Sequence, residues 1–263
     1  MSKLSVIIPA RNEADNIAAC IASVAWADEV LVVDDLSHDA TAELARAVGA
    51  RVLTHELRSW AAQKNWALER IANPWVLALD ADERVTPELA DSIRAVLSAD
   101  GPADGYRVLR RAYFLGRWMR FGSWRRDRPL RLFRRDLTHY PERAVHEAAE
   151  VGGRVGLLRG ALLHYSYRTM DDCFVKMRRY AERGALEWQR RGRRPSLPRL
   201  LLHGPFSFAQ DYIMRAGFLD GRRGLMLALF DAWQVTMREA KLWELSHSPT
   251  AVMSPADQEP CPR

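Results

Sequence analysis

The sequence contains few cysteines and no long apolar run, and each absence excludes a class of protein. Its three cysteines lie far apart and form no Cys-x-x-Cys motif, so neither a disulfide framework nor a zinc site is expected. No stretch approaches the roughly 18 consecutive apolar residues that a membrane-spanning helix needs. The N-terminal residues follow the pattern of a strand rather than that of a signal peptide, so we expect a cytoplasmic protein.

Internal repeats are also absent, and what the chain does contain is typical of a globular protein. Apolar residues make up 48% of its 263 residues, which is enough for one substantial domain with an appendage. The net charge of +6 is unevenly distributed, because residues 1–100 carry 9 basic and 16 acidic side chains, whereas residues 101–263 carry 30 and 17. A basic second half attracts phosphates, an anionic membrane or nucleic acid, although solubility alone also explains such a surface.

Strands alternate with helices over the first 100 residues. The predicted strands cover residues 4–9, 29–34, 50–54 and 75–79, and the predicted helices cover residues 14–25, 40–48, 60–72 and 87–98. This alternation indicates an α/β fold with a mostly parallel sheet flanked by helices. Ligands bind such a sheet beyond the carboxyl ends of its strands, where the polar segments 9–13, 34–39 and 80–82 are expected to converge.

The second half of the chain differs in character. Short segments at 106–109, 130–133 and 157–164 are predicted to complete the sheet, and helical spacing follows at 170–191 and 206–245, interrupted at 192–198 and 221–224. We therefore expect a catalytic domain over residues 1–168, a C-terminal helical extension over residues 169–246 and a flexible, proline-containing tail over residues 247–263.

Two carboxylates follow the fourth predicted strand. Asp80 and Asp82 come where the apolar run ends, and an extended chain would turn both side chains the same way. Mg²⁺ and Mn²⁺ take oxygen ligands and are held by one or two carboxylates together with substrate phosphates. A helix-capping role accounts for Thr86 and Glu88 at the start of the next helix, but not for the two earlier acids. The pattern therefore predicts a metal and phosphate site.

Taken together, these segments resemble glycosyltransferase family 2, the inverting enzymes of the GT-A (Rossmann-like) fold that use nucleotide-sugars. The motifs that carry the resemblance are Ser5–Glu13, Val32–Thr41, Ala62–Asn65 and Leu79–Glu83. Three later segments are similar to the subgroup that adds a sugar to the lipopolysaccharide inner core, the β-1,4-glucosyltransferase type: Leu130–Arg135, Val145–Glu147 and Leu163–Tyr167. The resemblance implies a UDP-sugar donor, expected to be UDP-glucose, which residues 1–100 would bind while residues 101–168 face the acceptor.

The resemblance also implies which residues bind the donor. The loop after the first strand would lie against the nucleotide base and ribose through Pro9, Ala10, Arg11 and Glu13. Asp34 resembles the aspartate that accepts a hydrogen bond from the uracil imide, although Asp35 replaces the small residue that is more usual beside it. Lys64 would place its ammonium near the pyrophosphate, and Gln63 would hydrogen-bond nearby; an exposed helix face is the alternative for this pair.

The resemblance also implies which residues bind the metal and which residue accepts the proton. Asp80 is expected to hold the ribose or a metal-bound water, and Asp82 to bind Mg²⁺ or Mn²⁺, with His164 completing the metal shell from the end of a strand. A hydrogen-bonded structural role is the alternative for His164. An inverting transfer needs a carboxylate that accepts the proton of the attacking hydroxyl, and the resemblance points to Glu147, although Asp is commoner there. The alternatives for the base are Glu142 and Asp136, and His146 would hydrogen-bond the acceptor or backbone.

The acceptor is expected to be a lipid-linked saccharide. Aromatic residues between Phe206 and Leu245 alternate with cations that include Arg222, Arg223 and Arg238, as in helices that lie in a membrane interface. Packing of these helices on the catalytic domain is the alternative. A phosphorylated lipid A acceptor would suit a basic surface, and the protein would then be peripheral on the inner face of the cytoplasmic membrane. A polyprenyl-phosphate, capsule or protein acceptor would use the same donor site.

Two other functions fit the sequence less well. A nucleic-acid-binding protein would use the arginine clusters, but no recognition motif accompanies them, so we expect no nucleic acid partner. A nucleotidyltransferase would need a glycine-rich, basic N-terminal loop for its triphosphate, and the segment 9–13 has no such composition.

Overall fold

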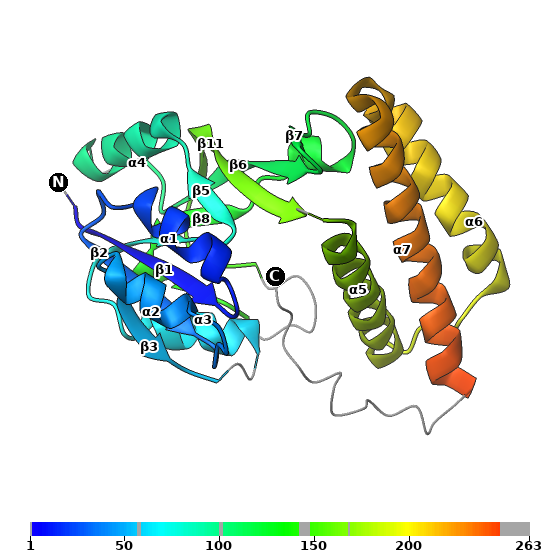
Figure 1. Cartoon of the computed structure of the whole chain (residues 1–263), viewed down its shortest axis with the longest axis horizontal. Coiled ribbons are helices and arrows are strands. Elements are labelled where there is room, and N and C mark those ends of the chain that lie inside the picture. The colour runs from blue at the N-terminus through cyan, green and yellow to red at the C-terminus, as the bar shows by residue number, and fades with distance from the viewer. Residues whose placement is uncertain (1, 57–58, 100–101, 142–147, 168, 248–263) are drawn as a thin grey trace. The chain divides into compact units, whose positions relative to one another are not determined.

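The computed structural model describes residues 2–56, 59–99, 102–141, 148–167 and 169–247. The chain forms two compact units (Figure 1). The first contains the residues up to Ala112 together with Arg126–Ser166, and the second contains Tyr113–Arg125 together with the residues from Tyr167 onward. The second unit is therefore assembled from two separate parts of the sequence.

A mixed sheet forms the centre of the first unit. Its first four strands run parallel in the order β3-β2-β1-β4, where β1 is Leu4–Ala10, β2 is Glu29–Asp34, β3 is Arg51–Thr54 and β4 is Trp75–Ala78. The sheet continues through β8 (Leu130–Arg134), β6 (Gly105–Phe114), β11 (Val155–Tyr167) and β5 (Glu83–Val85), with antiparallel pairing of β4 with β8, β8 with β6, and β11 with β5. The short strand β7 (Arg117–Trp118) pairs with β6, and β9 (Thr138–His139) pairs with β10 (Glu150–Val151).

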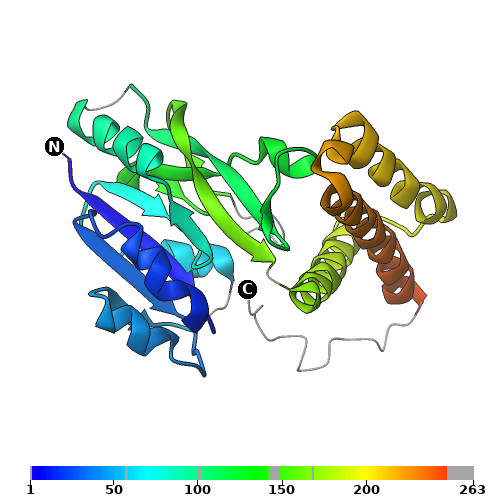
Figure 2. The same ribbon diagram turned by 45° about the horizontal axis from the view of Figure 1, so that its top comes forward.

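Helices cover both faces of the parallel strands, which explains why β1 is buried along its whole length. Successive side chains of a strand point to opposite faces. Val6 and Ile8 accordingly pack with α1 (Ala14–Ala22) and α4 (Pro87–Ala99), whereas Ile7 packs with α3 (Trp60–Leu68) on the other face. Helix α2 (Thr41–Ala47) packs beside α1 (Figure 2). The predicted α/β fold is thus confirmed.

The chain after β4 differs from the prediction. Asp80 and Asp82 were expected along an extended chain, but β4 ends at Ala78 and residues 80–83 form a turn. The amide of Glu83 donates to the carbonyl oxygen of Asp80 at 2.9 Å, which closes that turn. The prediction was wrong because alternation along a strand holds only while the strand continues. The predicted cap is confirmed, since the hydroxyl of Thr86 accepts from the amide of Leu89 at the start of α4.

Three helices dominate the second unit. They are α5 (Met170–Arg190), α6 (Leu197–Phe208) and α7 (Gly221–His247), and α7 lies between α5 and α6 and packs against both (Figure 1). A capping box begins α5, because the Thr169 hydroxyl accepts from the amide of Asp172 while the Asp172 carboxylate accepts from the amide of Thr169. A π-helical turn, η3 (Ala209–Met214), and a 3₁₀ turn, η4 (Gly217–Asp220), join α6 to α7.

The helix boundaries in this unit correct the prediction at three places. The segment 209–220 was expected to continue a helix from residue 206, but it forms the turns η3 and η4. Residues 221–224 were expected to interrupt a helix, but they are the first turn of α7. Gly224 is required there because a Cβ atom would collide with the carbonyl oxygen of Gly217 in the preceding turn. The predicted break at 192–198 is shorter than expected, since α6 already begins at Leu197 with Pro198 in its first turn, a position that proline tolerates.

Over the described residues, no helix combines the length and apolar composition needed to cross a bilayer. Apart from His247, the expected tail at 247–263 lies outside the described residues.

Candidate functional site

The polar loops that follow β1, β2 and β4 lie at one edge of the sheet. The parallel register pairs Ala10 of β1 with Asp34 of β2, and Ile7 of β1 with Ala78 of β4. These strands therefore end close together, and the segments after Ala10, Asp34 and Ala78 meet beyond their carboxyl ends. This is the edge at which an open α/β sheet binds its ligands.

The loop after β1 is fastened to the loop after β2. Pro9 and Ala10 are still part of β1, and the amide of Asp35 donates to the carbonyl oxygen of Ala10 at 2.9 Å. The Arg11 guanidinium lies 3.1 Å from the buried carboxylate of Asp35, so the acid that is unusual for the family at this position has a partner. Glu13 is buried at the start of α1, where its carboxylate accepts from Asn16 at 2.7 Å. Glu13 therefore fixes the end of the loop to the first turn of α1.

Asp34 is the buried acid that best fits a nucleobase. It ends β2, and one carboxylate oxygen, Oδ2, accepts from the amide of Ser37 at 3.3 Å. The other oxygen, Oδ1, is buried and has no hydrogen-bond partner among the residues that the structure describes. A buried acceptor without a donor is costly unless a ligand supplies one. The imide N–H of uracil is a donor of the required kind.

Helix α3 brings Gln63 and Lys64 to this edge. Gln63 is fully buried, with Nε2 donating to the carbonyl oxygen of His55 at 3.4 Å and with Oε1 unpaired within the described residues. The half-buried Lys64 places its ammonium 5.2 Å from the ring centre of Tyr140. The side chain of Asn65 exchanges two hydrogen bonds with the backbone of Tyr140, at 2.8 and 2.9 Å. These residues do not form the exposed helix face that was the alternative.

Two arginines hold the turn that contains the Asp-x-Asp motif. Nη2 of the buried Arg131 lies 2.8 Å from Asp80 Oδ2 and 2.6 Å from Glu83 Oε1. Arg110 lies 3.3 Å from the same Glu83 oxygen and 2.6 Å from Asp127. Burial opposes the positive charge on Arg131, but Asp80 and Glu83 raise its pKa above the usual value. The turn is therefore fixed by charged hydrogen bonds from β6 and β8 as well as by its own backbone.

Asp82 and His164 meet at the end of the same turn. The imidazole Nε2 of His164 lies 3.3 Å from Asp82 Oδ2, and its Nδ1 lies 2.7 Å from the hydroxyl of Ser166. The register of β11 against β5 explains the contact, since it pairs His164 with Glu83, next to Asp82 in the chain. When the Ser166 hydroxyl accepts from Nδ1–H, the lone pair of Nε2 is directed toward Asp82 or toward an ion beside it.

The donor set around Asp82 fits a divalent ion that is shared with a substrate. A carboxylate and an imidazole lie side by side, with Asp80 on the same turn. In the part of the chain that the structure describes, no three His, Cys, Asp or Glu side chains converge as a complete ligand set. An ion held here would need further oxygen atoms, and Mg²⁺ or Mn²⁺ commonly takes them from substrate phosphates and water.

Three residues of this edge had no role in the expectations from sequence: Glu83, Arg110 and Arg131. The signal for Arg131 was present, because one arginine interrupts the apolar run Leu130-Arg-Leu-Phe of a buried strand. A buried charge requires a partner of opposite sign, which here means a carboxylate in a neighbouring loop. The predicted base Glu147, its alternative Glu142 and the neighbouring His146 lie outside the described residues. Asp136, the other alternative, has an exposed side chain 3.6 Å from Arg134.

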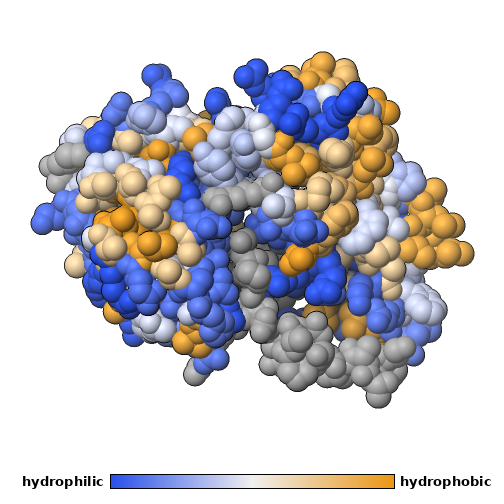
Figure 3. All heavy atoms as spheres, viewed as in Figure 1, coloured by the Kyte–Doolittle hydropathy of each residue, from blue (hydrophilic) through white to orange (hydrophobic). Residues whose placement is uncertain are grey.

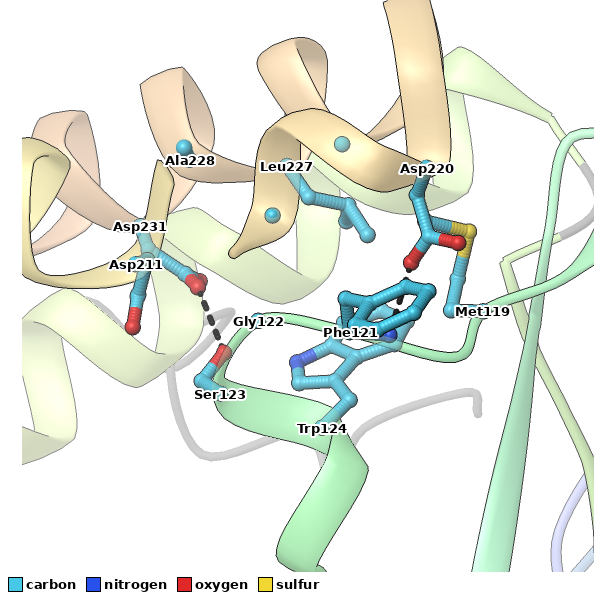
Figure 4. Close-up of a pocket in the computed structure, with 12 residues that line it drawn as sticks. Met119, Phe121, Gly122, Ser123, Trp124, Asp211, Asp220, Leu227, Ala228 and Asp231 are labelled. Carbon is cyan, nitrogen blue, oxygen red and sulfur yellow. Dashed lines mark hydrogen bonds between the residues drawn. The ribbon is translucent and has the colours of Figure 1, made fainter. Parts of the chain in front are cut away.

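A second polar cluster lies inside the helical unit, in a small pocket next to the loop that follows β7 (Figure 4). The Ser123 hydroxyl donates to Asp231 of α7 at 3.1 Å, and Asp220 accepts from the amides of Arg120 and Phe121. Burial, followed by a hydrogen bond with Asp211, raises the pKa of Asp231 to about 7. These contacts join the loop to the helices of the same unit.

Several known proteins are similar to this chain. The family model described as Glycosyl transferase family 2 matches residues 5–162. A lipopolysaccharide core biosynthesis glycosyltransferase of Rhizobium meliloti, LpsC, is 32% identical over 251 residues, which cover 90% of this chain and 93% of that protein. An uncharacterized glycosyltransferase of Rickettsia prowazekii is 28% identical, over 94% of this chain and 88% of its own length.

A solved structure shares the fold. The mannosyltransferase PcManGT from Pyrobaculum calidifontis, in complex with GDP-Man and Mn²⁺, is similar with a TM-score of 0.55 and 15% identity, over 92% of this chain and 88% of that one. The family match covers Asp34, Asp80 and Asp82 and ends two residues before His164. Fold, motifs and relatives agree with the resemblance found in the sequence. The chain belongs to glycosyltransferase family 2.

Proposed function

We propose that this glycosyltransferase moves a hexose, with inversion, from a UDP-sugar to a lipid-linked saccharide of the lipopolysaccharide inner core, with UDP-glucose as the donor. The observation that carries the proposal is the convergence of Asp34 with the Asp80–Asp82 turn at the carboxyl ends of β2 and β4, on either side of β1. One end of this edge offers an acceptor for a nucleobase, and the other offers ligands for a diphosphate-bound ion.

Residues 1–100 bind the nucleotide in this proposal. Asp34 Oδ1 accepts a hydrogen bond from the imide N–H of uracil, because it is a buried acceptor with no described donor. The loop Pro9–Glu13 lies against the base and ribose, with Arg11 kept in place by Asp35. Lys64, beside Tyr140, directs its ammonium to the pyrophosphate, and Gln63 has an acceptor left for the same ligand. Asp80 contacts the ribose through the oxygen that Arg131 orients.

The metal is Mg²⁺ or Mn²⁺ in this proposal, held by Asp82 and His164. A divalent ion bound there supplies positive charge that stabilises the departing diphosphate. Asp82 provides the anionic ligand, and His164, oriented by Ser166, provides a neutral one. The mannosyltransferase of the same fold was solved with Mn²⁺.

Residues 101–168 face the acceptor, and Glu147 accepts the proton of the attacking hydroxyl. The buried Tyr140 and Ala149 anchor the chain on both sides of Glu147. The lipid-linked acceptor is supported by the 32% identical relative that acts in lipopolysaccharide core biosynthesis. This acceptor would place the protein on the inner face of the cytoplasmic membrane. A polyprenyl-phosphate, a capsule saccharide or a protein acceptor would need the same donor site.

A screen of UDP- and GDP-sugars for slow hydrolysis, with and without Mg²⁺ or Mn²⁺, tests the donor and the metal. UDP-glucose should be hydrolysed only with metal, and Asp82→Ala should abolish this activity while the thermal unfolding midpoint is kept. Asp91→Ala, which removes an exposed acid of α4, is the matched control and should keep full activity. Metal-independent hydrolysis, or an active Asp82→Ala variant, would contradict the assignment.

A further inference from the structure

One side of helix α6 packs against α7, and this contact fixes which side faces away. Gly204 is buried, and a Cβ atom at this position would collide with the hydroxyl of Thr236 in α7. Successive residues of a helix are about 100° apart around its axis. Leu202 and Phe206 lie on the half of α6 opposite Gly204, whereas Leu197 and Leu201 lie nearer to the side of Gly204 but are also exposed. With the first exposed residues of η3 they form a set of large, exposed apolar side chains that we call the α6 face: Leu197, Leu201, Leu202, Phe206, Ile213 and Met214.

The α6 face is exposed to a degree that is unusual for large apolar side chains. Each of its six residues is at least 59% exposed. Figure 3 shows apolar side chains gathered at the right-hand edge of the view, over α6. A contiguous apolar patch on the surface of a soluble protein marks a site of contact with another apolar surface. These large apolar side chains are therefore exposed instead of being packed against the neighbouring helices.

The charge around the α6 face has a single sign. Between Glu187 and Asp211 the sequence contains five arginines and no acidic residue. Arg191 and Arg199 form ion pairs with Glu187 and Glu239. The other three, Arg190, Arg193 and Arg194, are exposed and form no ion pair with a described carboxylate. Exposed apolar side chains flanked by exposed cations complement a surface that is apolar inside and anionic at its rim.

Two of the cations that the sequence suggested for membrane contact are used inside the helical unit. Arg223 donates to the carbonyl oxygen of Leu115 at 2.8 Å, and the guanidinium of Arg238 lies 4.0 Å from the ring centre of Trp188. Burial is the largest cause that lowers the pKa of Arg238. Arg193 and Arg194, in the α5–α6 connection, remain exposed at the start of the α6 face, although the guanidinium of Arg193 lies 4.8 Å from the centre of the same Trp188 ring.

We propose that the α6 face docks this protein on an anionic lipid surface. The apolar side chains enter the boundary between headgroups and acyl chains, and Arg193 and Arg194 contact the phosphates. A lipid surface is favoured over a second copy of the chain because the segment between Glu187 and Asp211, which contains α6, carries only basic charged residues, and two copies would bring them against each other. The inference deepens the proposed function. It rests on that function in one respect only, namely that docking brings the enzyme to a lipid-linked acceptor.

Sedimentation with vesicles of phosphatidylcholine, with and without phosphatidylglycerol, tests the docking surface. The full chain should bind the vesicles that contain phosphatidylglycerol, and less so as salt rises, because charge attraction is screened within about 8 Å at physiological ionic strength. The triple variant Leu201→Gln, Leu202→Gln and Phe206→Gln should bind at least about tenfold more weakly. Arg193→Gln with Arg194→Gln should remove the preference for phosphatidylglycerol.

The matched control replaces three exposed apolar residues of the first unit. Leu44→Gln, Val48→Gln and Leu157→Gln, at side chains that are 37–57% exposed, should leave vesicle binding unchanged. UDP-glucose hydrolysis by the α6 variant should stay at the wild-type level, which shows that it is folded and separates docking from donor chemistry. Equal vesicle binding by the α6 variant and the wild type would overturn the proposal. So would a wild-type protein that ignores vesicles but self-associates through these same side chains.

Discussion

The contact between Arg131 and the Asp80–Glu83 turn is a buried interaction between charges, and losing it has a large energetic consequence. The buried guanidinium of Arg131 pairs with both carboxylates, and Arg110 of the next strand lies farther from each of them, at 3.8 Å from Asp80 and 3.3 Å from Glu83. Removing one partner of a buried ion pair costs about 3–5 kcal/mol, because the remaining charge stays buried without compensation. Arg131 therefore determines both the stability of the turn and the orientation of Asp80.

For Arg131→Gln we expect a free energy of unfolding about 3 kcal/mol lower than that of the wild type, measured by urea denaturation. Adding Glu83→Gln should recover part of this loss, since it removes one of the carboxylates left unpaired. It should not recover the KM for the donor, because Asp80 would still lack the group that orients it. Arg51→Gln breaks an exposed pair with Glu29 and is the control, with an expected change below about 1 kcal/mol. Recovery of both quantities would mean that Arg131 is structural only.

The proposed base Glu147 is tested by the change that keeps its shape. Glu147→Gln cannot accept a proton, so kcat should fall by about 100-fold or more while the KM for the donor changes little. The acidic limb of the kcat profile should disappear as well, because it reports the protonation of this carboxylate. Asp136→Asn and Glu142→Gln are the comparisons. If either gives the larger loss of kcat, the base is that residue.

At the scale of elements, Asp231 ties helix α7 to the loop that follows β7 and makes this contact sensitive to pH. Its pKa is raised from the usual 3.8 to about 7 by burial and by its hydrogen bond with Asp211. Between these two values the folded state keeps a proton that the unfolded state releases. The resulting stabilisation is complete below about pH 4 and is lost as the pH rises through about 7.

Asp231→Asn mimics the protonated side chain and should remove this dependence. At about pH 8 the variant should be more stable than the wild type by about 4 kcal/mol, and near pH 4 the two should be equal. The thermal unfolding midpoint measured across this range checks the expectation. Asp91→Asn, which changes an exposed acid, should leave the midpoint nearly constant. A variant that is destabilised equally at every pH would show that the charged form of Asp231 is the stabilising one.

Helix boundaries show where local pattern is a sufficient guide and where it is not. The predicted elements up to α5 begin close to their predicted positions, because apolar periodicity and caps such as that of Thr169 act over a few residues. The short strands β5, β7, β9 and β10 were not predicted. Residues 221–224 were misread as a break because glycine is a poor helix former. Glycine is needed at position 224 because the carbonyl oxygen of Gly217 leaves no room for a side chain, and this is a contact with another element.

At the scale of the whole molecule, the charge asymmetry of the sequence acquires a partial explanation. Many of the arginines in the second half are structural: Arg110 and Arg131 neutralise the acidic turn, and Arg199, Arg223 and Arg238 hold the helical unit together. Net charge alone therefore overstated the cationic surface. The arginines left exposed next to the α6 face are fewer, and they define a more specific surface than the total suggested.

The sequence by itself determined the family, the α/β alternation and the edge of the sheet at which the polar loops converge, because motifs and periodicity are local properties of the chain. Only the tertiary structure decided which ionisable side chains contact one another. His164 and Asp82 are brought together by the register of β11 on β5, and Arg131 reaches Asp80 and Glu83 from β8. Tyr113–Arg125 joins the helical unit through Phe114 and Met119, which pack with Tyr167 and Leu227. Contacts between residues far apart in sequence depend on how the strands pair in the sheet and how the helices pack, so a local pattern does not reveal the partner.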